Sequence, residues 1–170
     1  MEGIRHTLQE QESVVLEELD YIPPVSPVWK VVGWSLPALI VGSIVFIGWQ
    51  KGLSAAGENA LFWFFANGIP SGIGGLLAMA HPLTTVTAFL AAPFTSLTPV
   101  IGVGYVTAFV QAYLQPPLVR EFQTVAEDIA IPRKWWKSRL LRVFLAFILP
   151  TLGSIIGTWV GGTRIVSNLF

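Results

Sequence analysis

The sequence predicts an all-α protein of the polytopic membrane class, with four to five hydrophobic segments. Hydrophobic residues make up 53% of its 170 residues and charged residues only 12%, about half the ~25% of a soluble domain. Three stretches carry no Asp, Glu, Lys or Arg, namely residues 31–50, 59–119 and 143–163. Because roughly 20 helical residues cross a bilayer core, these stretches hold four crossings and leave length for a fifth. A soluble single-core domain is excluded.

Charge and cysteine content exclude further classes. Lys plus Arg and Asp plus Glu each number 10, so the net charge gives no electrostatic basis for binding nucleic acid. The chain has no Cys, which excludes disulfides, thiol nucleophiles and Cys-ligated zinc. We expect no cofactor.

Residues 1–24 form an acidic lead. Its apolar residues recur at helical spacing, and Pro23 and Pro24 end the pattern. Such an acidic start lacks the basic and apolar regions of a secretory signal, so the first membrane helix must direct insertion. Two interpretations stay open, an amphipathic helix packed on the membrane domain and a linker helix from a soluble domain. The membrane domain then covers residues 25–170.

The first span is expected over residues 31–49. Lys30 and Lys51 bracket it, and Trp29, Trp34 and Trp49 lie where the two membrane interfaces would be. Tryptophan rings favour that interfacial depth, so the bounds of this span are clear from the sequence.

The long uncharged block must contain breaks. Residues 60–80 fit one helix, but residues 83–114 as a single helix would be about 48 Å long and overshoot the bilayer core. We therefore expect a break between Pro93 and Pro99, with shorter segments over residues 84–92 and 99–114. A second break is expected between Gly68 and Gly75, because four Gly and one Pro in nine residues disfavour a helix. Such broken or re-entrant helices must be buried against protein or line a wet cavity.

A loop and a final span follow. Residues 115–142 combine an amphipathic segment with a basic, Trp-containing cluster and hold six of the ten basic residues, so the positive-inside rule makes this loop cytoplasmic. The last span, residues 143–160, carries a stripe of small residues at fourfold spacing, namely Gly153, Gly157 and Gly161. The stripe favours close helix packing within the chain, with a homo-oligomer as the alternative.

Polar residues inside the block form the candidate intramembrane site. They are Asn67, Ser71, His81, Thr84, Thr95, Ser96 and Thr98. A catalytic zinc needs about three protein ligands, whereas the block offers one His and no carboxylate, so we assign no metal and no catalytic residue. His81 could serve Ser71 or Ser96 as a base, but the same side chains suit hydrogen bonds that close broken helices. A structural role and a polar path for a peptide or ion both stay open.

Several runs resemble the C-terminal membrane domain of the TraB/PrgY family. The similarity extends from Glu17 to Thr158 and rests on these runs: Glu17-Glu18-Leu19-Asp20-Tyr21-Ile22-Pro23-Pro24, Asn67-Gly68 with Ser71, Leu77-Ala78-Met79-Ala80-His81-Pro82-Leu83-Thr84, Ala88-Phe89-Leu90-Ala91-Ala92-Pro93-Phe94-Thr95-Ser96-Leu97-Thr98-Pro99, and Leu152-Gly153-Ser154 with Gly157-Thr158. The resemblance implies a prokaryotic multi-pass protein of the cell membrane, archaeal or bacterial.

The resemblance also implies a function. The family includes pheromone-shutdown proteins, in which a suspected metal-dependent hydrolase domain precedes this membrane region. Nothing in this chain matches that domain, so its hydrolytic residues cannot be carried over, and we expect the chain alone to hydrolyse nothing. We expect a module that anchors or senses, with the lipid bilayer, a hydrophobic peptide and a soluble TraB-type domain as partners. A small transporter or channel with a midplane polar site is the alternative.

Two structural expectations follow. We expect the region 84–114 to make one net crossing, which puts the N-terminus outside when the basic loop is inside. Asn67 and His81 should be buried, and the Thr95 and Thr98 hydroxyls should bond main-chain groups, because an unpaired polar group in hydrocarbon costs several kcal/mol.

Overall fold

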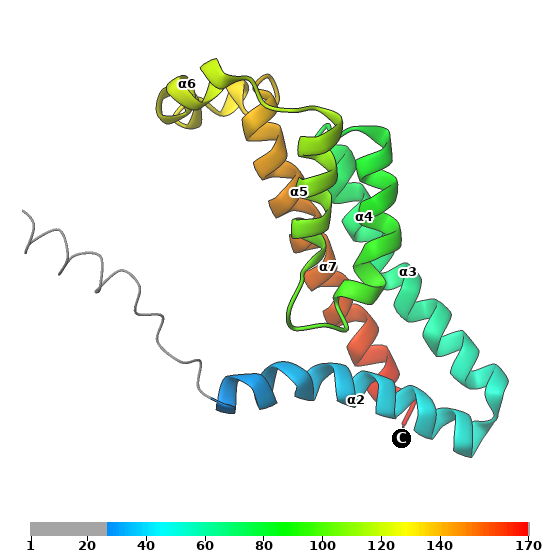
Figure 1. Ribbon diagram of the computed structural model, residues 1–170. Coiled ribbons are helices and arrows are strands. Elements are labelled where there is room, and N and C mark those ends of the chain that lie inside the picture. The colour runs from blue at the N-terminus through cyan, green and yellow to red at the C-terminus, as the bar shows by residue number, and fades with distance from the viewer. Residues whose placement is uncertain (1–26, 170) are drawn as a thin grey trace, which may run out of the picture. The chain divides into compact units, whose positions relative to one another are not determined.

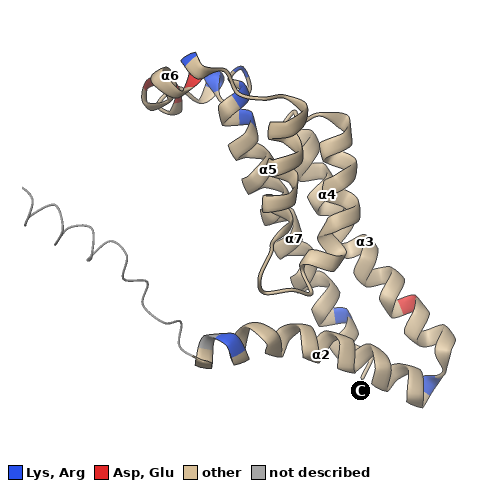
Figure 2. Ribbon diagram, viewed as in Figure 1, with Lys and Arg blue, Asp and Glu red and all other residues tan. Residues whose placement is uncertain are grey.

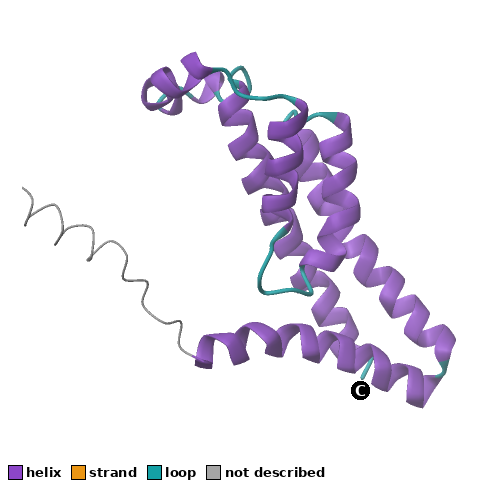
Figure 3. Cartoon of the chain, in the orientation of Figure 1, coloured by secondary structure: helices purple, strands orange, loops and turns teal. Residues whose placement is uncertain are grey.

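The computed structural model describes residues 27–169, and these residues form helices joined by turns, without strands (Figure 3). The helices in chain order (Figure 1) are α2 Pro27–Lys51, α3 Leu53–Leu77, α4 Pro82–Thr95, α5 Val103–Leu114, α6 Val119–Ile129 and α7 Arg139–Ser167, with a short 3-10 turn η1 at Pro132–Lys134. The all-α prediction is confirmed. The acidic lead over residues 1–24 lies outside the described residues.

Three of the described helices are long and apolar enough to cross a membrane. They cover Lys30–Lys51, Leu53–Leu77 and Arg139–Ser167. The chain divides into two compact units, residues 1–32 and 33–170, and the packing below is that of the second unit. There α3 and α7 pack along each other, α4 packs on α3, and α5 packs on both α7 and α4.

Charged residues gather at two ends of the α3–α7 pair and leave its middle uncharged (Figure 2). At one end, here called the loop end, the Trp136 indole Nε1 donates to the Leu77 carbonyl at 2.8 Å, which joins the end of α3 to the start of α7. At the opposite, far end the Lys51 Nζ donates to the Asn168 carbonyl at 2.6 Å. The two helices therefore run antiparallel over their whole length.

Helix α3 is continuous through its glycine-rich part. The break predicted between Gly68 and Gly75 is wrong, because one helix runs from Leu53 to Leu77. Tertiary packing explains this outcome. A Cβ on Gly74 would collide with the Leu149 carbonyl of α7, and one on Gly68 would lie 2.8 Å from the Phe89 carbonyl of α4. Such close contacts offset the helix cost of glycine, about 1 kcal/mol each.

The break near Pro93 and Pro99 exists, but it lies further along the chain than predicted. Helix α4 continues through Pro93 to Thr95, and α5 begins only at Val103. The main-chain N–H of His81, at the start of α4, donates to the Gln111 Oε1 near the end of α5 at 2.9 Å. Helices α4 and α5 thus form an antiparallel hairpin that starts and ends at the loop end (Figure 1). The expected single net crossing of this region is wrong, because the two half-helices reverse direction at residues 96–102.

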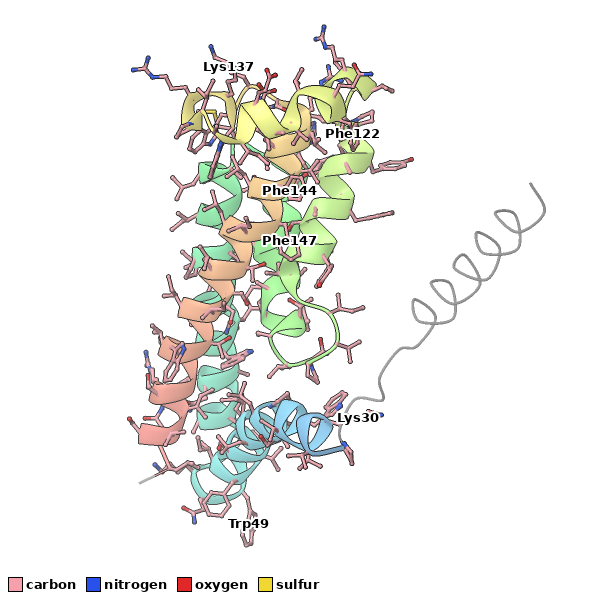
Figure 4. All side chains as sticks on the ribbon, turned by 90° about the vertical axis from the view of Figure 1, so that its left-hand side faces the viewer. Lys30, Trp49, Phe122, Lys137, Phe144 and Phe147 are labelled. Carbon is pink, nitrogen blue, oxygen red and sulfur yellow. The ribbon has the colours of Figure 1, made fainter. Side chains whose placement is uncertain are left out.

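The last helix is longer than predicted. The loop before it contains the expected amphipathic helix, α6. Helix α7 covers Arg139–Ser167 instead of residues 143–160, and the Ser138 hydroxyl caps it by accepting from the Leu141 N–H at 3.4 Å. Helix α6 has no buried residue. It is an exposed amphipathic helix at the loop end, where Figure 4 places Phe122 and Lys137, with Trp49 at the opposite end.

Candidate functional site

The seven candidate polar residues fall into three groups rather than one. Asn67 and Ser71 lie on α3 and face α7, His81 and Thr84 lie at the start of α4, and Thr95, Ser96 and Thr98 lie at the tip of the hairpin. The groups differ in burial, since Asn67, Ser71 and Thr84 are fully buried whereas Thr98 is exposed. Each group therefore has its own chemistry.

The first group joins α3 to α7. The Asn67 Nδ2 donates to the Trp63 carbonyl at 3.1 Å, and its Oδ1 accepts from the Thr158 hydroxyl at 3.0 Å. The Ser71 hydroxyl donates to the Pro150 carbonyl at 3.0 Å. Asn67 is buried as predicted, and both side chains are hydrogen-bonded within the protein.

Three of the prolines inside described helices, Pro70, Pro93 and Pro150, each release a carbonyl that faces a neighbouring helix. Proline lacks the N–H that would bond the carbonyl four residues earlier. The Ala146 carbonyl, released by Pro150, accepts from the Thr107 hydroxyl of α5 at 2.6 Å. The Ala66 carbonyl, released by Pro70, faces the α-carbon of Gly157.

The third released carbonyl belongs to Phe89 and follows from Pro93. A Cβ on Gly68 would lie 2.8 Å from this oxygen, so the glycine hydrogen that it would replace points at it. Such Cα–H to carbonyl contacts recur at helix interfaces and are weakly stabilising. The Pro93 carbonyl itself accepts from the Trp63 indole at 3.1 Å. Thr107 and Trp63 were missed by sequence reasoning, although Thr107 lies one turn before a second buried polar residue, Gln111, at helical spacing.

The stripe of Gly153, Gly157 and Gly161 is covered by α3 within the chain. Cβ atoms on Gly153 and Gly157 would collide with the Pro70 and Ala66 carbonyls, and one on Gly161 would lie 2.8 Å from the Trp63 ring. The prediction of close packing within the chain is confirmed for this stripe.

The second group belongs to a polar chain at the loop end. His81 is only half-buried and caps α4, because its Nδ1 accepts from the Leu83 N–H at 3.2 Å. The expectation that His81 is buried is wrong, because as the N-cap of α4 it lies at the loop end and stays partly exposed. Its main-chain N–H bonds the fully buried Gln111, whose Nε2 donates to the Gln115 Oε1 at 3.0 Å.

Arg142 of α7 completes this chain of hydrogen bonds. Its Nη1 donates to the Gln115 Oε1 at 3.1 Å and its Nη2 to the Trp136 carbonyl at 2.6 Å. These hydrogen bonds connect the base of the α4–α5 hairpin to the start of α7. Thr84, by contrast, is buried with a hydroxyl that has no partner among the described residues. Neither Gln111 nor Arg142 was singled out from the sequence.

The third group closes the hairpin tip. The Thr95 hydroxyl donates to the Ala91 carbonyl at 3.0 Å, and the Ser96 hydroxyl to the Pro93 carbonyl at 3.1 Å. The Thr98 hydroxyl lies 3.1 Å from both the Thr95 and Ile101 carbonyls. The prediction that Thr95 and Thr98 bond main-chain groups is confirmed. Thr95 and Ser96 also line a pocket of about 210 Å³ between the tip and α7.

Charged side chains at the loop end hold α6 in place. The Glu121 carboxylate accepts from the Leu118 N–H at 2.9 Å and the Arg139 N–H at 2.8 Å. Burial raises the pKa of Glu121, but these main-chain hydrogen bonds outweigh it and leave the pKa below its ordinary value. The Lys134 Nζ lies 2.6 Å from the Asp128 Oδ1, and this contact lowers the pKa of Asp128.

Comparison with known proteins identifies the family. Within the described residues no three His, Cys, Asp or Glu side chains are grouped as a metal ion would require. No curated protein and no solved structure matched the chain. The family model of the TraB family protein, C-terminal domain, matches residues 28–170. The chain therefore belongs to the TraB family, of which it carries the C-terminal domain.

Proposed function

We propose that this domain anchors a TraB-type protein in a prokaryotic cell membrane, with α3 and α7 as spans. The observation that carries the proposal is the long α3–α7 pair, which is uncharged between its ends. Arg142 and Arg164 lie 22 residues apart on α7, which is about 33 Å of helix and matches a bilayer core of about 30 Å.

The α4–α5 hairpin then re-enters the membrane from the loop end without crossing it. Its first helix has 14 residues, about 21 Å of length, which is too short for a full span. Its base bonds His81 to Gln111 at the loop end, and its tip packs beside Ser154 in the middle of α7. By the positive-inside rule the loop end is cytoplasmic.

Helix α6 lies in the cytoplasmic interface. Val119, Phe122 and Ile129 are exposed by 80%, 58% and 51%, and an apolar helix face of this kind is stabilised by acyl chains. Exposed basic side chains of the same loop, including Lys137, suit anionic headgroups (Figure 4). The bilayer is thus the first partner of the domain.

The biological role of the anchor is inferred from the family. A membrane domain of this kind would hold a soluble TraB-type domain beside the membrane, where inhibition or processing of peptide pheromones or other hydrophobic peptides takes place. The deep polar side chains Asn67, Ser71 and Thr107 bond other parts of the same chain, which favours anchoring over transport.

Membrane extraction of a fusion tests the anchoring proposal. A soluble reporter joined to the N-terminus should stay with the membrane after alkaline carbonate and after high salt, because two apolar spans hold it. The Gly157→Leu variant, which separates α3 from α7, serves as the control for a failed bundle. Release of the parent fusion by carbonate would contradict anchoring, and solute leakage from liposomes that contain the pure protein would favour a transporter or channel.

A further inference from the structure

The hairpin tip and the middle of α7 line an open pocket that the anchoring role does not use. It has a volume of about 210 Å³ and is lined by the end of α4, the start of α5 and one face of α7. The lining residues at the start of α5 are Gly102 and Val103. If α7 spans the membrane as proposed, this pocket lies well inside the hydrocarbon region.

The start of α5 offers main-chain donors to this pocket. The first N–H groups of a helix have no partner in their own helix and need a cap. Gly102 occupies the capping position of α5 and supplies no side chain, and the first main-chain bond there is from Tyr105 N–H to the Gly102 carbonyl at 3.1 Å. Val103 lines the pocket, and its N–H has no partner among the described residues.

Ser154 is the second, independent observation. This side chain of α7 is only 8% exposed and lines the same pocket. Its hydroxyl makes no hydrogen bond to any described residue. Unpaired donors at this depth are costly, because hydrocarbon cannot accept a hydrogen bond.

The remaining hydroxyls of the pocket use their protons elsewhere. Thr95 and Ser96 donate to carbonyls of α4, and Thr151 donates to the Phe147 carbonyl at 2.6 Å. Thr158 donates to the Asn67 Oδ1. The free donors are thus those of Ser154 and the α5 start, so a molecule that complements them brings oxygen acceptors.

A second groove continues the pocket along α7. It has a volume of about 530 Å³, shares Thr158 and Trp159 with the first pocket, and is otherwise lined mainly by apolar groups such as Leu36, Leu39 and Val166. No charged side chain lines either space. A carboxylate or phosphate would have no counter-ion here, which makes its burial unfavourable.

We propose that these adjoining spaces bind a neutral membrane lipid, of the class of diacylglycerols, quinones and long-chain alcohols. Its carbonyl or hydroxyl oxygen accepts from Ser154 and from the start of α5, and its hydrocarbon chain lies against Trp159, which lines both spaces. This proposal goes beyond anchoring. It rests on the proposed function only in assuming that α7 spans the bilayer.

Photolabelling of the full chain in nanodiscs tests this proposal. The probes are a diacylglycerol and a phosphatidylcholine that carry the same photoreactive acyl chain, and a hydrophobic peptide with the same photoreactive group. We expect the diacylglycerol probe to label α7 near Ser154 and to be displaced by unlabelled diacylglycerol. Ser154→Ala should weaken this labelling about three- to tenfold, the effect of one hydrogen bond.

A second variant separates ligand loss from misfolding. A Cβ on Gly102 meets no atom within 4 Å, and its backbone is extended with φ −84°, so Gly102→Ser can cap α5 with its own hydroxyl. We expect this variant to raise the melting temperature while it lowers diacylglycerol labelling. Thr87→Ala, which removes a hydroxyl of α4 bonded to the Leu83 carbonyl, should leave labelling unchanged.

Four results would overturn the proposal. They are equal labelling by the diacylglycerol and phosphatidylcholine probes, labelling by the peptide probe alone, labelling that Ser154→Ala and Gly102→Ser leave unchanged, and no displaceable labelling, which would mean that water alone fills the pocket. Carbonate extraction of the same preparation reports separately on anchoring, so the two proposals fail independently.

Discussion

The α3–α7 pair consists of unbroken helices, whereas the α4–α5 hairpin contains a helix break. In the pair, Pro70 and four neighbouring glycines leave α3 unbroken, whereas between α4 and α5 the chain leaves the helix at residues 96–102. The pair is packed backbone against backbone through Gly74 and Gly157. The hairpin is closed by side-chain hydrogen bonds at its base and tip. At Pro70, Pro93 and Pro150 the helix continues, and in each case a neighbouring helix meets the carbonyl that the proline releases.

Replacing a glycine at the contact between α3 and α7 should cause the largest loss of stability. In Gly157→Leu the new side chain collides with the Ala66 carbonyl of α3, and we expect a loss of more than about 3 kcal/mol or no folded protein. Thermal unfolding in detergent measures the loss. The control is Gly57→Ala in the exposed part of α3, where a Cβ meets nothing within 4 Å and a gain of about 1 kcal/mol is expected. Equal stability of the two variants would show that backbone packing does not hold the pair.

Thr107→Val removes the hydroxyl that meets the carbonyl released by Pro150. We expect a loss of about 1–3 kcal/mol, because the buried Ala146 carbonyl is left without a partner. Adding Pro150→Ala returns an N–H to that carbonyl, so the cost of Thr107→Val should shrink in the double variant. Thr163→Val, whose hydroxyl bonds only its own exposed helix, is the control. An additive double-mutant cycle would refute the pairing.

Met79→Gly should stabilise the end of α3 by about 1 kcal/mol. Met79 has φ 49°, and the bonds Met79 N–H to Leu76 carbonyl and Ala80 N–H to Gly75 carbonyl form a Schellman motif. Glycine adopts that conformation without the steric cost of a side chain. Thermal unfolding of the parent and the variant shows whether the substitution stabilises the protein. A lower melting temperature for the glycine variant would contradict the assigned turn.

The smallest effect concerns the pH dependence of helix α6. Because the pKa of Glu121 is lowered by folding, its contribution is complete above the ordinary value of 4.5 and is lost as the pH falls through the lower, folded value. Proteolysis of the loop should therefore quicken as the pH falls below about 4.5. Glu121→Gln should flatten this dependence and leave only the part that comes from Asp128. A Gln variant with the full pH dependence would show that Glu121 does not hold α6.

The sequence predicted the fold class correctly, but it predicted the bounds of the helices and the place of the helix break less well. The charge-free stretch at 143–163 predicted the presence of α7 but not its full length, and the prolines at 93 and 99 predicted a break close to where it occurs. The continuity of α3 could not be foreseen, because the contacts of Gly68 and Gly74 come from helices distant in sequence. For the same reason Gln111 and Thr107 were missed, since a polar residue in an apolar helix does not reveal which carbonyl it meets. The local bonds of Thr95 and Thr98 were predictable because their partners lie within four residues.

The direction of the α4–α5 hairpin is tested most directly by the accessibility of single cysteines, since the natural chain has none. Reporters at Met79 and Pro116 flank the hairpin, Lys137 marks the loop end and Ser54 the far end, and all four residues are exposed. With a membrane-impermeant maleimide on oriented vesicles, we predict that positions 79, 116 and 137 are labelled from the cytoplasmic side and position 54 from the other. Labelling of positions 79 and 116 from opposite sides would mean that this region crosses the membrane and would contradict the hairpin.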